Sequence, residues 1–178
     1  MGAVPLVTRL ADNLDQIAER TGRGAAWLAL ALVLVTFGVV VLRYLFDFGS
    51  IALQESILYL HASLFLLGAA YTLKADAHVR VDIFYRRLSS RSRALVDLLG
   101  ALLLLLPVCS FLLWISWDYV ATAWSLHEGS RETGGLPYVY LLKTLIPVAA
   151  GLLILQGISQ ALRSLATLLG HPDAGSRS

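Results

Sequence analysis

Four long apolar stretches that contain no Asp, Glu, Lys or Arg constrain this chain more than any other feature of its sequence. They are residues 24–42, 56–73, 98–117 and 144–162. About 20 apolar residues, at a rise of about 1.5 Å each, cross a hydrocarbon layer of about 30 Å. Because an open-ended span satisfies its backbone polar groups in lipid only as a helix, the sequence predicts an all-α integral membrane protein with four transmembrane helices.

The composition agrees with a membrane location. Of the 178 residues, 57% are hydrophobic and 15% are charged, whereas soluble domains average about 45–50% and about 25%. One small core cannot bury such an excess. The single cysteine, Cys109, excludes an internal disulfide and a cysteine zinc site, and the net charge of +2 does not indicate a nucleic-acid partner.

The basic residues predict the orientation of the spans. All but three of the 14 lysines and arginines fall before the first span, between the second and third, or after the fourth. The three on the opposite side are Arg43, Arg131 and Lys143. Short loops rich in Lys and Arg stay in the cytoplasm. Both termini and a basic loop between the second and third spans are therefore predicted to be cytoplasmic.

These patterns divide the chain into three parts. Residues 24–169 are predicted to form a four-helix transmembrane domain. Its spans are expected at about 24–46, 54–73, 94–119 and 139–163. Residues 170–178 are short and polar, which predicts a flexible cytoplasmic tail.

The segment of residues 1–23 precedes the first span. Val7, Leu10, Leu14 and Ile17 recur there at helical spacing, with charged residues elsewhere on the wheel. This pattern predicts a short amphipathic helix that lies in the cytoplasmic interface. The alternative is a partly ordered polar tail.

Glu55 stands at the outer start of the second span, with Tyr59 one turn later in the same stripe. A carboxylate that faces lipid is costly, so we expect Glu55 to face protein or water. Its functional interpretation is a contact with an ion, a proton or a partner protein, of which the partner contact is favoured. The alternative is an edge residue that reaches the lipid headgroups.

His61 lies deeper in the second span. A haem-binding bundle needs paired axial histidines on facing helices. The other histidines all fall in loops or tails: His78, His127 and His171. A packing role for His61 is therefore favoured over haem ligation.

The connection after the second span contains His78, Arg80 and Asp82 in alternation. In an extended conformation these three side chains would share one side, and the arginine and the aspartate could pair. A solvated charge cluster beside the membrane is the alternative.

Two prolines interrupt the later spans, Pro107 in the third and Pro147 in the fourth. Each removes a helical hydrogen bond, which predicts a fixed kink, with a hinge as the alternative. Gln156, Gln160 and Arg163 share a face of the fourth span. Amides bond across helix contacts in membranes, so we expect this face to pack against protein, either of this chain or of a partner.

The sequence contains no Gly-rich phosphate loop, no HExxH motif and no pair of acids spaced for hydrolysis. It also lacks a broken helix with converging polar groups, which substrate sites of transporters often use. We therefore predict no catalytic, metal, cofactor or substrate site, and the chain is not expected to be an enzyme.

A series of short motifs follows the spans in order. They are Leu53-Gln54-Glu55-Ser56, Leu67 to Lys74, His78 to Asp82, Glu128-Gly129-Ser130, Gly135-Leu136-Pro137 and Leu142 to Pro147. On a frame of four helices, this order resembles the small permease (DctQ-like) subunit of tripartite ATP-independent periplasmic (TRAP) transporters. The likeness covers residues 54–163.

The resemblance implies a function that the residues alone do not show. It implies a multi-pass protein of the bacterial inner membrane that braces a large elevator-type permease, with a periplasmic binding protein and membrane lipids as further partners. It also implies uptake of an organic anion, commonly a carboxylate, driven by sodium, with the substrate and sodium sites in the large subunit. The residues then expected at partner or structural contacts are Glu55, Tyr59, His78, Arg80, Asp82, Glu128, Pro137, Pro147, Gln156 and Gln160.

Two other classes of protein remain as alternatives. A tetrahelical membrane redox protein is suggested by His61 and the four spans, but it needs a second intramembrane histidine. A small self-sufficient ion-coupled transporter is suggested by the membrane carboxylate of Glu55.

Overall fold

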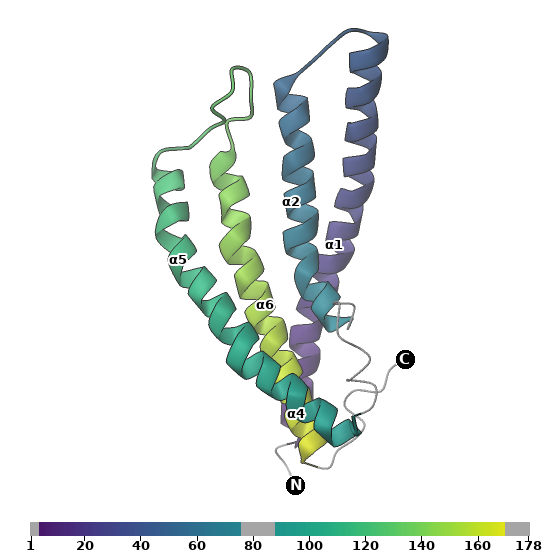
Figure 1. Cartoon of the computed structure of the whole chain (residues 1–178), viewed down its shortest axis with the longest axis vertical. Coiled ribbons are helices and arrows are strands. Elements are labelled where there is room, and N and C mark those ends of the chain that lie inside the picture. Colours follow the sequence, from purple (N-terminus) through teal and green to yellow (C-terminus); the bar gives the residue numbers. More distant parts are fainter. Residues whose placement is uncertain (1–3, 76–87, 170–178) are drawn as a thin grey trace.

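The structure is a computed structural model, and it describes residues 4–75 and 88–169. All regular elements of the described residues are helical (Figure 1). They are α1 (Val4–Leu45), α2 (Ile51–Lys74), α4 (Ser90–Gly100), the π-helical turn η1 (Ala101–Leu105), α5 (Leu106–Ser125) and α6 (Val139–Leu168).

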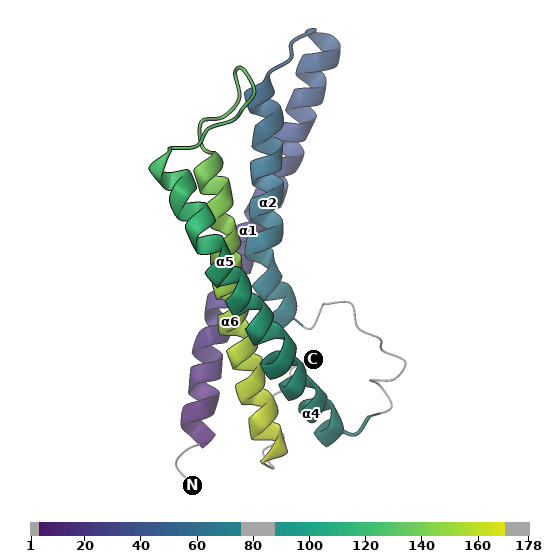
Figure 2. The same ribbon diagram turned by 60° about the vertical axis from the view of Figure 1, so that its left-hand side comes forward.

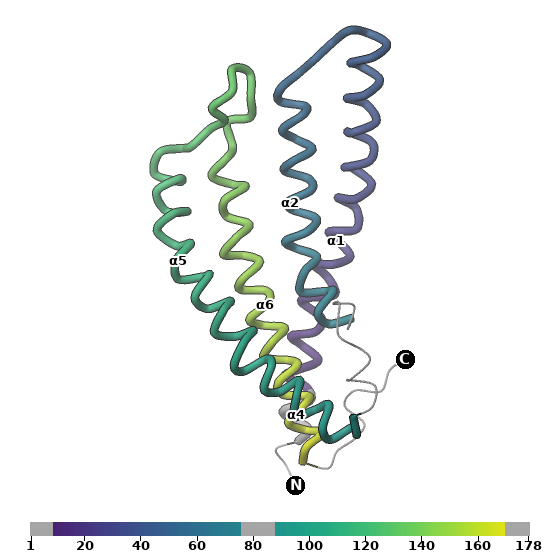
Figure 3. Tube along the Cα trace, viewed as in Figure 1, coloured from purple at the N-terminus to yellow at the C-terminus, as the bar shows by residue number. Residues whose placement is uncertain are grey.

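Four of these helical stretches are long and apolar enough to cross a membrane. They are Arg9–Leu45, Ile51–Lys74, Ser90–Ser125 and Val139–Leu168. The third stretch joins α4, η1 and α5 into one helix, whose unbroken course is visible in the Cα trace of Figure 3. The prediction of an all-helical protein with four transmembrane helices is confirmed, while the side of the membrane on which the termini lie stays a prediction.

The helices form two hairpins, α1 with α2 and α5 with α6. Figure 1 shows that the hairpins separate toward the loops at residues 46–50 and 126–138 and approach each other at the opposite end. There the lower half of α6 lies between α1 and α4 (Figure 2), and contacts of α6 with α1, α2, α4 and α5 agree with this central place. The helix α6 therefore holds the two hairpins together.

The N-terminal segment is helical, as predicted, but it is part of a longer helix. In the structure α1 runs without interruption for 42 residues, which is about 63 Å at about 1.5 Å per residue. Ala11, Ala18 and Ala25 are buried along this helix at intervals of seven residues. Because one packing face continues from the N-terminal segment into the span, both belong to the same helix. Its placement at the membrane interface stays a prediction.

Pro107 is the second residue of α5 and lies two positions after the end of the π-helical turn η1. A proline inside a helix lacks an N–H group and clashes with the carbonyl four residues earlier, and the wider π turn relieves this conflict. Leu105 and Leu106 at the end of the turn pack against Gly157 of α6, where a Cβ atom would lie 2.7 Å and 3.3 Å from their Cδ2 atoms. The turn thus lets the third span approach α6 closely.

The interior is built mostly from small residues, as in other membrane bundles, where small side chains let helices approach closely. Apart from Val120 and Cys109, the buried apolar side chains of the described residues are all alanines. Large apolar side chains point outward instead, such as Trp27 with 74% of its surface exposed and Trp114 with 75%. Such an outer surface suits lipid or an apolar partner rather than water.

The contact between Gly22 of α1 and Tyr71 of α2 offers a test of the first hairpin. A Cβ atom on Gly22 would lie 2.4 Å from Cγ of Tyr71, whereas one on Gly24 would meet nothing within 4 Å. We expect Gly22→Ala to lower the free energy of unfolding in mixed micelles by about 1–3 kcal/mol through overpacking. The matched control Gly24→Ala should leave it unchanged or raise it by up to about 1 kcal/mol. Equal effects of the two variants would contradict this packing.

Candidate functional site: polar ties at the two ends of the bundle

A hydrogen-bonded cluster joins the two hairpins at the end where they approach each other. It consists of Asp15 on α1 and Gln156, Ser159 and Arg163 on α6, and we call it the inner tie. Helical spacing brings the three α6 residues to one face, because positions three and four apart are neighbours on a helix surface. A single carboxylate on α1 therefore reaches all three side chains.

Both oxygens of the Asp15 carboxylate accept two hydrogen bonds each. Oδ1 accepts from Nε2 of Gln156 at 3.0 Å and from Oγ of Ser159 at 2.6 Å. Oδ2 accepts from Nε of Arg163 at 3.1 Å and from its Nη2 at 2.6 Å. Two N–H groups of the guanidinium thus donate to Oδ2, and the neutral amide and hydroxyl groups donate to Oδ1. This carboxylate is saturated with donors inside the protein.

The charged groups of the inner tie are largely removed from solvent, so each of them needs a partner within the protein. Only 13% of the Asp15 side chain and 29% of the Arg163 side chain are exposed, and Ser159 and Gln156 are buried at 0% and 4% exposure. Removal of one member of such a pair leaves an uncompensated charge, which is strongly destabilising. Arg163 also reaches Asp12 at 2.7 Å, but that carboxylate is 61% exposed, so its contribution is expected to be small.

A second cluster joins the hairpins at the opposite end, and we call it the outer tie. Glu55 of α2 accepts a hydrogen bond from the Ser130 hydroxyl at Oε1 and one from the backbone N–H of Leu136 at Oε2, the latter at 2.6 Å. Both donors belong to the loop between α5 and α6. Glu55 therefore faces protein, and its two oxygens are engaged by its own chain.

The loop is folded so that its donors converge on Glu55. The backbone N–H of Ser130 donates to the carbonyl of Leu136 at 2.9 Å, which closes the loop on itself. Gly134 turns the chain at a φ of 83°, a conformation in which glycine pays no steric penalty. A Cβ atom on Gly135 would lie 2.3 Å from Oγ of Ser130 and 2.9 Å from Oε1 of Glu55. Glycine at this position lets the loop close over the carboxylate.

Glu128 and Lys143 anchor the two ends of the same loop. Nζ of Lys143 lies 2.5 Å from Oε2 of Glu128 and 3.9 Å from the ring centroid of Tyr119. Nearby, Nε1 of Trp124 donates to Oγ1 of Thr144 at 2.8 Å. These contacts join the end of α5 to the start of α6, so the loop that holds Glu55 is itself held at its base.

The other predicted site residues within the described part of the chain differ in burial and in their contacts. The Tyr59 hydroxyl and Oε1 of Gln156 are buried and have no hydrogen-bond partner within the described part of the chain. Pro137 lies against Gly129, where a Cβ atom would be 3.3 Å from its Cα. Pro147 lies within α6, which continues to Leu168, and Gln160 is half-buried on that helix.

Three further predicted residues, His78, Arg80 and Asp82, lie outside the described residues. His61 is exposed, and its ring centroid lies 5.3 Å from that of Phe65. Within residues 4–75 and 88–169, no group of three His, Cys, Asp or Glu side chains is placed to hold a metal ion. The expectation of a chain without cofactors stays a prediction.

Sequence reasoning missed Asp15, the central residue of the inner tie, and Ser130 of the outer tie. The N-terminal segment was interpreted from its apolar residues, whereas its buried face consists of Ala11 and Ala18 with Asp15 between them. The seven-residue spacing of Ala11 and Ala18, with Asp15 on the same helix face between them, was the available signal. It indicates a helix face that packs closely and needs a polar partner.

The fold and the ties define a class of protein: a helical membrane protein of four spans whose two hairpins are joined by polar contacts at both ends. A family model described as "Tripartite ATP-independent periplasmic transporters, DctQ component" matches residues 32–167. The chain belongs to this family, and it is a small permease subunit of a TRAP transporter and a multi-pass protein of the inner membrane.

One curated relative matches part of the chain. The C4-dicarboxylate TRAP transporter small permease protein DctQ of Vibrio cholerae serotype O1 (strain ATCC 39315 / El Tor Inaba N16961) is 33% identical over 89 residues. This similarity covers 50% of the present chain and 38% of the relative. No solved structure matches the chain.

Removal of the Glu55 carboxylate should release the loop that covers it. We expect Glu55→Ala to increase hydrogen exchange at the backbone amides of residues 130–136 by about tenfold or more, because the Leu136 N–H and the Ser130 hydroxyl lose their acceptor. The control Glu132→Ala removes an exposed carboxylate of the same loop and should leave exchange unchanged. Unchanged exchange in Glu55→Ala would show that the outer tie does not order the loop.

Proposed function

We propose that this chain is the non-catalytic brace of a sodium-gradient-driven TRAP transporter. In this proposal it binds a large elevator-type permease subunit and supports uptake of an organic anion that a periplasmic binding protein delivers. Membership of the DctQ family supports the role of a subunit. The name of the Vibrio cholerae relative refers to C4-dicarboxylates, and this supports a carboxylate as the substrate class here.

The pair of polar ties carries the proposal. An elevator mechanism needs a static part against which the mobile part moves, and a static part must resist deformation. The inner tie joins α1 to α6, and the outer tie joins α2 to the loop before α6. The inner tie lies at the end where the hairpins approach each other, and the outer tie involves the loop of residues 126–138 at the opposite end (Figure 1). Two contacts at opposite ends resist rotation of one hairpin about either contact alone. Such a frame is suited to bracing rather than to alternating access.

The inner tie also argues against substrate binding by this chain. Its carboxylate is saturated by four donors, so a cation or a substrate would have to displace protein groups. Glu55, the carboxylate of the outer tie, is likewise engaged by two donors. We therefore place the sodium and substrate sites in the large subunit, without a cofactor in this chain.

The surface available to a partner lies on the outer faces of the spans. The helix α6 contacts the other helices and is the most buried of the four spans, whereas Trp27, Val33 and Phe37 expose 64–74% of their surfaces on α1. Among the site residues predicted from the sequence, Glu55, Glu128 and Gln156 make polar contacts within the chain itself. We therefore assign contact with the large subunit to the exposed apolar faces, and the remainder of these faces to lipid.

The proposal is tested by removing and restoring the chain in cells that otherwise carry the transporter. Deletion should reduce sodium-dependent uptake of the organic anion to background, because the large subunit loses its support, and re-expression should restore it. A tagged chain solubilised in mild detergent should co-purify with one larger membrane protein. Full uptake by the large subunit without this chain would contradict the proposal, as would a purified chain that transports alone.

A further inference from the structure

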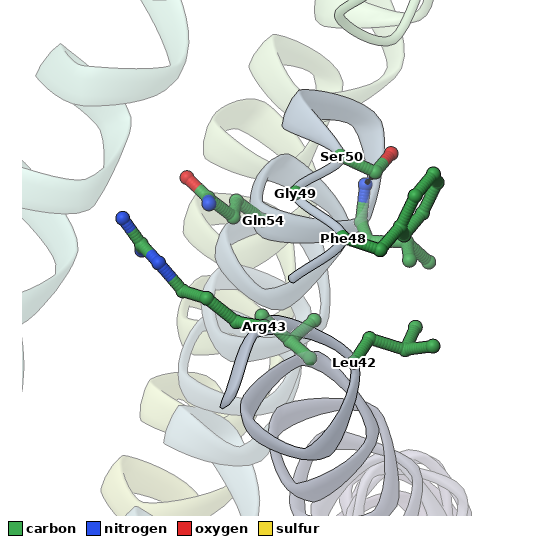
Figure 4. A pocket seen from close by; sticks show the side chains of 8 residues that line it. Leu42, Arg43, Phe48, Gly49, Ser50 and Gln54 are labelled. Atoms are coloured by element: carbon green, nitrogen blue, oxygen red, sulfur yellow. Dashed lines mark hydrogen bonds between the residues drawn. The ribbon is translucent and has the colours of Figure 1, made fainter. Parts of the chain in front are cut away.

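One face of α2 is exposed and carries polar side chains within the span, while the helix packs on α1 and α6 through its other faces. Residues three and four positions apart are neighbours on a helix, and five such residues form a stripe along this face. We call them the α2 stripe: Gln54, Leu58, His61, Phe65 and Gly68. Gln54 and His61 are exposed, and so are Leu58 at 56% and Phe65 at 70%. Figure 4 shows the amide of Gln54 extending to the side opposite Phe48.

His61 lies near the middle of the span. At about 1.5 Å per residue it is about 15 Å along the helix from Ile51, the first residue of α2, and about 20 Å from Lys74, the last. Lysine and arginine reach the headgroups on long, flexible stems, whereas one methylene group joins an imidazole to the backbone. The polar atoms of His61 therefore stay at the depth of the hydrocarbon.

The imidazole of His61 makes no hydrogen bond to any described residue. Its ring neighbour is Phe65, with 5.3 Å between the ring centroids, and a phenyl ring has no oxygen or nitrogen acceptor. An imidazole carries at least one N–H donor in either charge state. A donor left without an acceptor in hydrocarbon is costly, so the molecule that covers this face must supply the acceptor.

Thr36 of α1 shows the contrasting case of an exposed polar residue that suits lipid. It lies within the first span and is exposed, but its hydroxyl donates to the carbonyl of Leu32 at 2.7 Å. The helix itself satisfies this group, so hydrocarbon can cover it. The α2 stripe differs because His61 has a donor that its own helix does not satisfy. This difference indicates that protein, and not lipid, covers the α2 stripe.

We propose that the α2 stripe binds one transmembrane helix of the large permease subunit, and that this helix supplies an oxygen acceptor to the imidazole of His61. Leu58 and Phe65 flank His61 and bury apolar surface in the contact. A Cβ atom on Gly68 would meet nothing within 4 Å, so the partner helix can approach the backbone closely there. The identity of the partner rests on the proposed function as a subunit of a larger permease.

A second copy of this chain fits the α2 stripe less well. Two copies packed through the stripe would place the same residues opposite each other at each depth. The stripe offers no side-chain oxygen at the depth of His61, because the amide of Gln54 lies about 10 Å away along the helix. A different chain can supply an acceptor at the required depth, which favours the large subunit.

The affinity between the two subunits tests the role of His61. The full-length chain and the large subunit of the same transporter are labelled with fluorophores and titrated in mixed micelles by energy transfer. We expect His61→Phe, which keeps a ring beside Phe65 and loses the donor, to raise Kd about threefold to tenfold, as for one interhelical hydrogen bond in a membrane. His61→Gln keeps an N–H donor and should bind more tightly than His61→Phe. The matched control Thr36→Val removes a hydroxyl that α1 satisfies itself and should bind as the wild type does.

Photocrosslinking identifies what covers the stripe without relying on the affinity of a variant. The photoreactive residue p-benzoylphenylalanine is placed at position 65, where it replaces another aromatic side chain, in cells that carry the whole transporter. We expect a covalent adduct with the large subunit. An adduct with a second copy of this chain, or adducts with lipid alone, would overturn the assignment of the surface.

The outcomes separate this inference from the proposed function. An unchanged Kd in His61→Phe would overturn the hydrogen bond to His61. If the wild-type chain still binds the large subunit and restores uptake in that case, the proposed function stands and the inference alone fails. A wild-type chain that does not bind the large subunit would contradict the proposed function, and the inference with it.

Discussion

The structure depends on one carboxylate that is shared between its first and last helices. Asp15 accepts hydrogen bonds from Gln156, Ser159 and Arg163, and only 13% of its side chain is exposed. In a bundle whose interior consists mainly of alanine, apolar burial distinguishes poorly between neighbouring helices and lipid, since both offer similar contacts. A largely buried charge does distinguish a neighbouring helix from lipid, because only the helix can supply a polar partner that compensates it. The inner tie therefore selects the arrangement in which α1 packs on α6.

The outer tie joins the two hairpins at the end opposite the inner tie. Glu55 fixes the loop before α6, so the two hairpins are connected at the end where they otherwise diverge. Neither tie leaves a free carboxylate oxygen for a transported ion. A helical frame that is closed by its own polar groups and covered outside by large apolar side chains is suited to support another membrane protein. This combination supports the proposal that the transport sites lie in a partner subunit.

The sequence predicts the spans well because an uncharged apolar run has few alternatives to a membrane helix. It predicts the ties poorly because they join distant residues. Asp15 and Ser159 are 144 positions apart, and nothing local marks one as the partner of the other. The turn signals at Gly134 and Gly135 predict a loop, but not that its amides converge on Glu55. The predicted N-terminal helix is part of the longer helix α1 for a related reason. Its apolar residues suggested an interfacial face, whereas Ala11 and Ala18 pack inside the protein.

The most direct test of this account is the coupling free energy between Asp15 and Arg163. It is obtained from a double-mutant cycle of Asp15→Ala and Arg163→Ala, with unfolding followed in mixed micelles. We expect a coupling of about 1–3 kcal/mol for this pair, and at most about 1 kcal/mol for the exposed pair of Asp12 and Arg163 in a parallel cycle. A coupling near zero between Asp15 and Arg163, or one no larger than that of Asp12, would contradict the claim that this contact holds the two hairpins together.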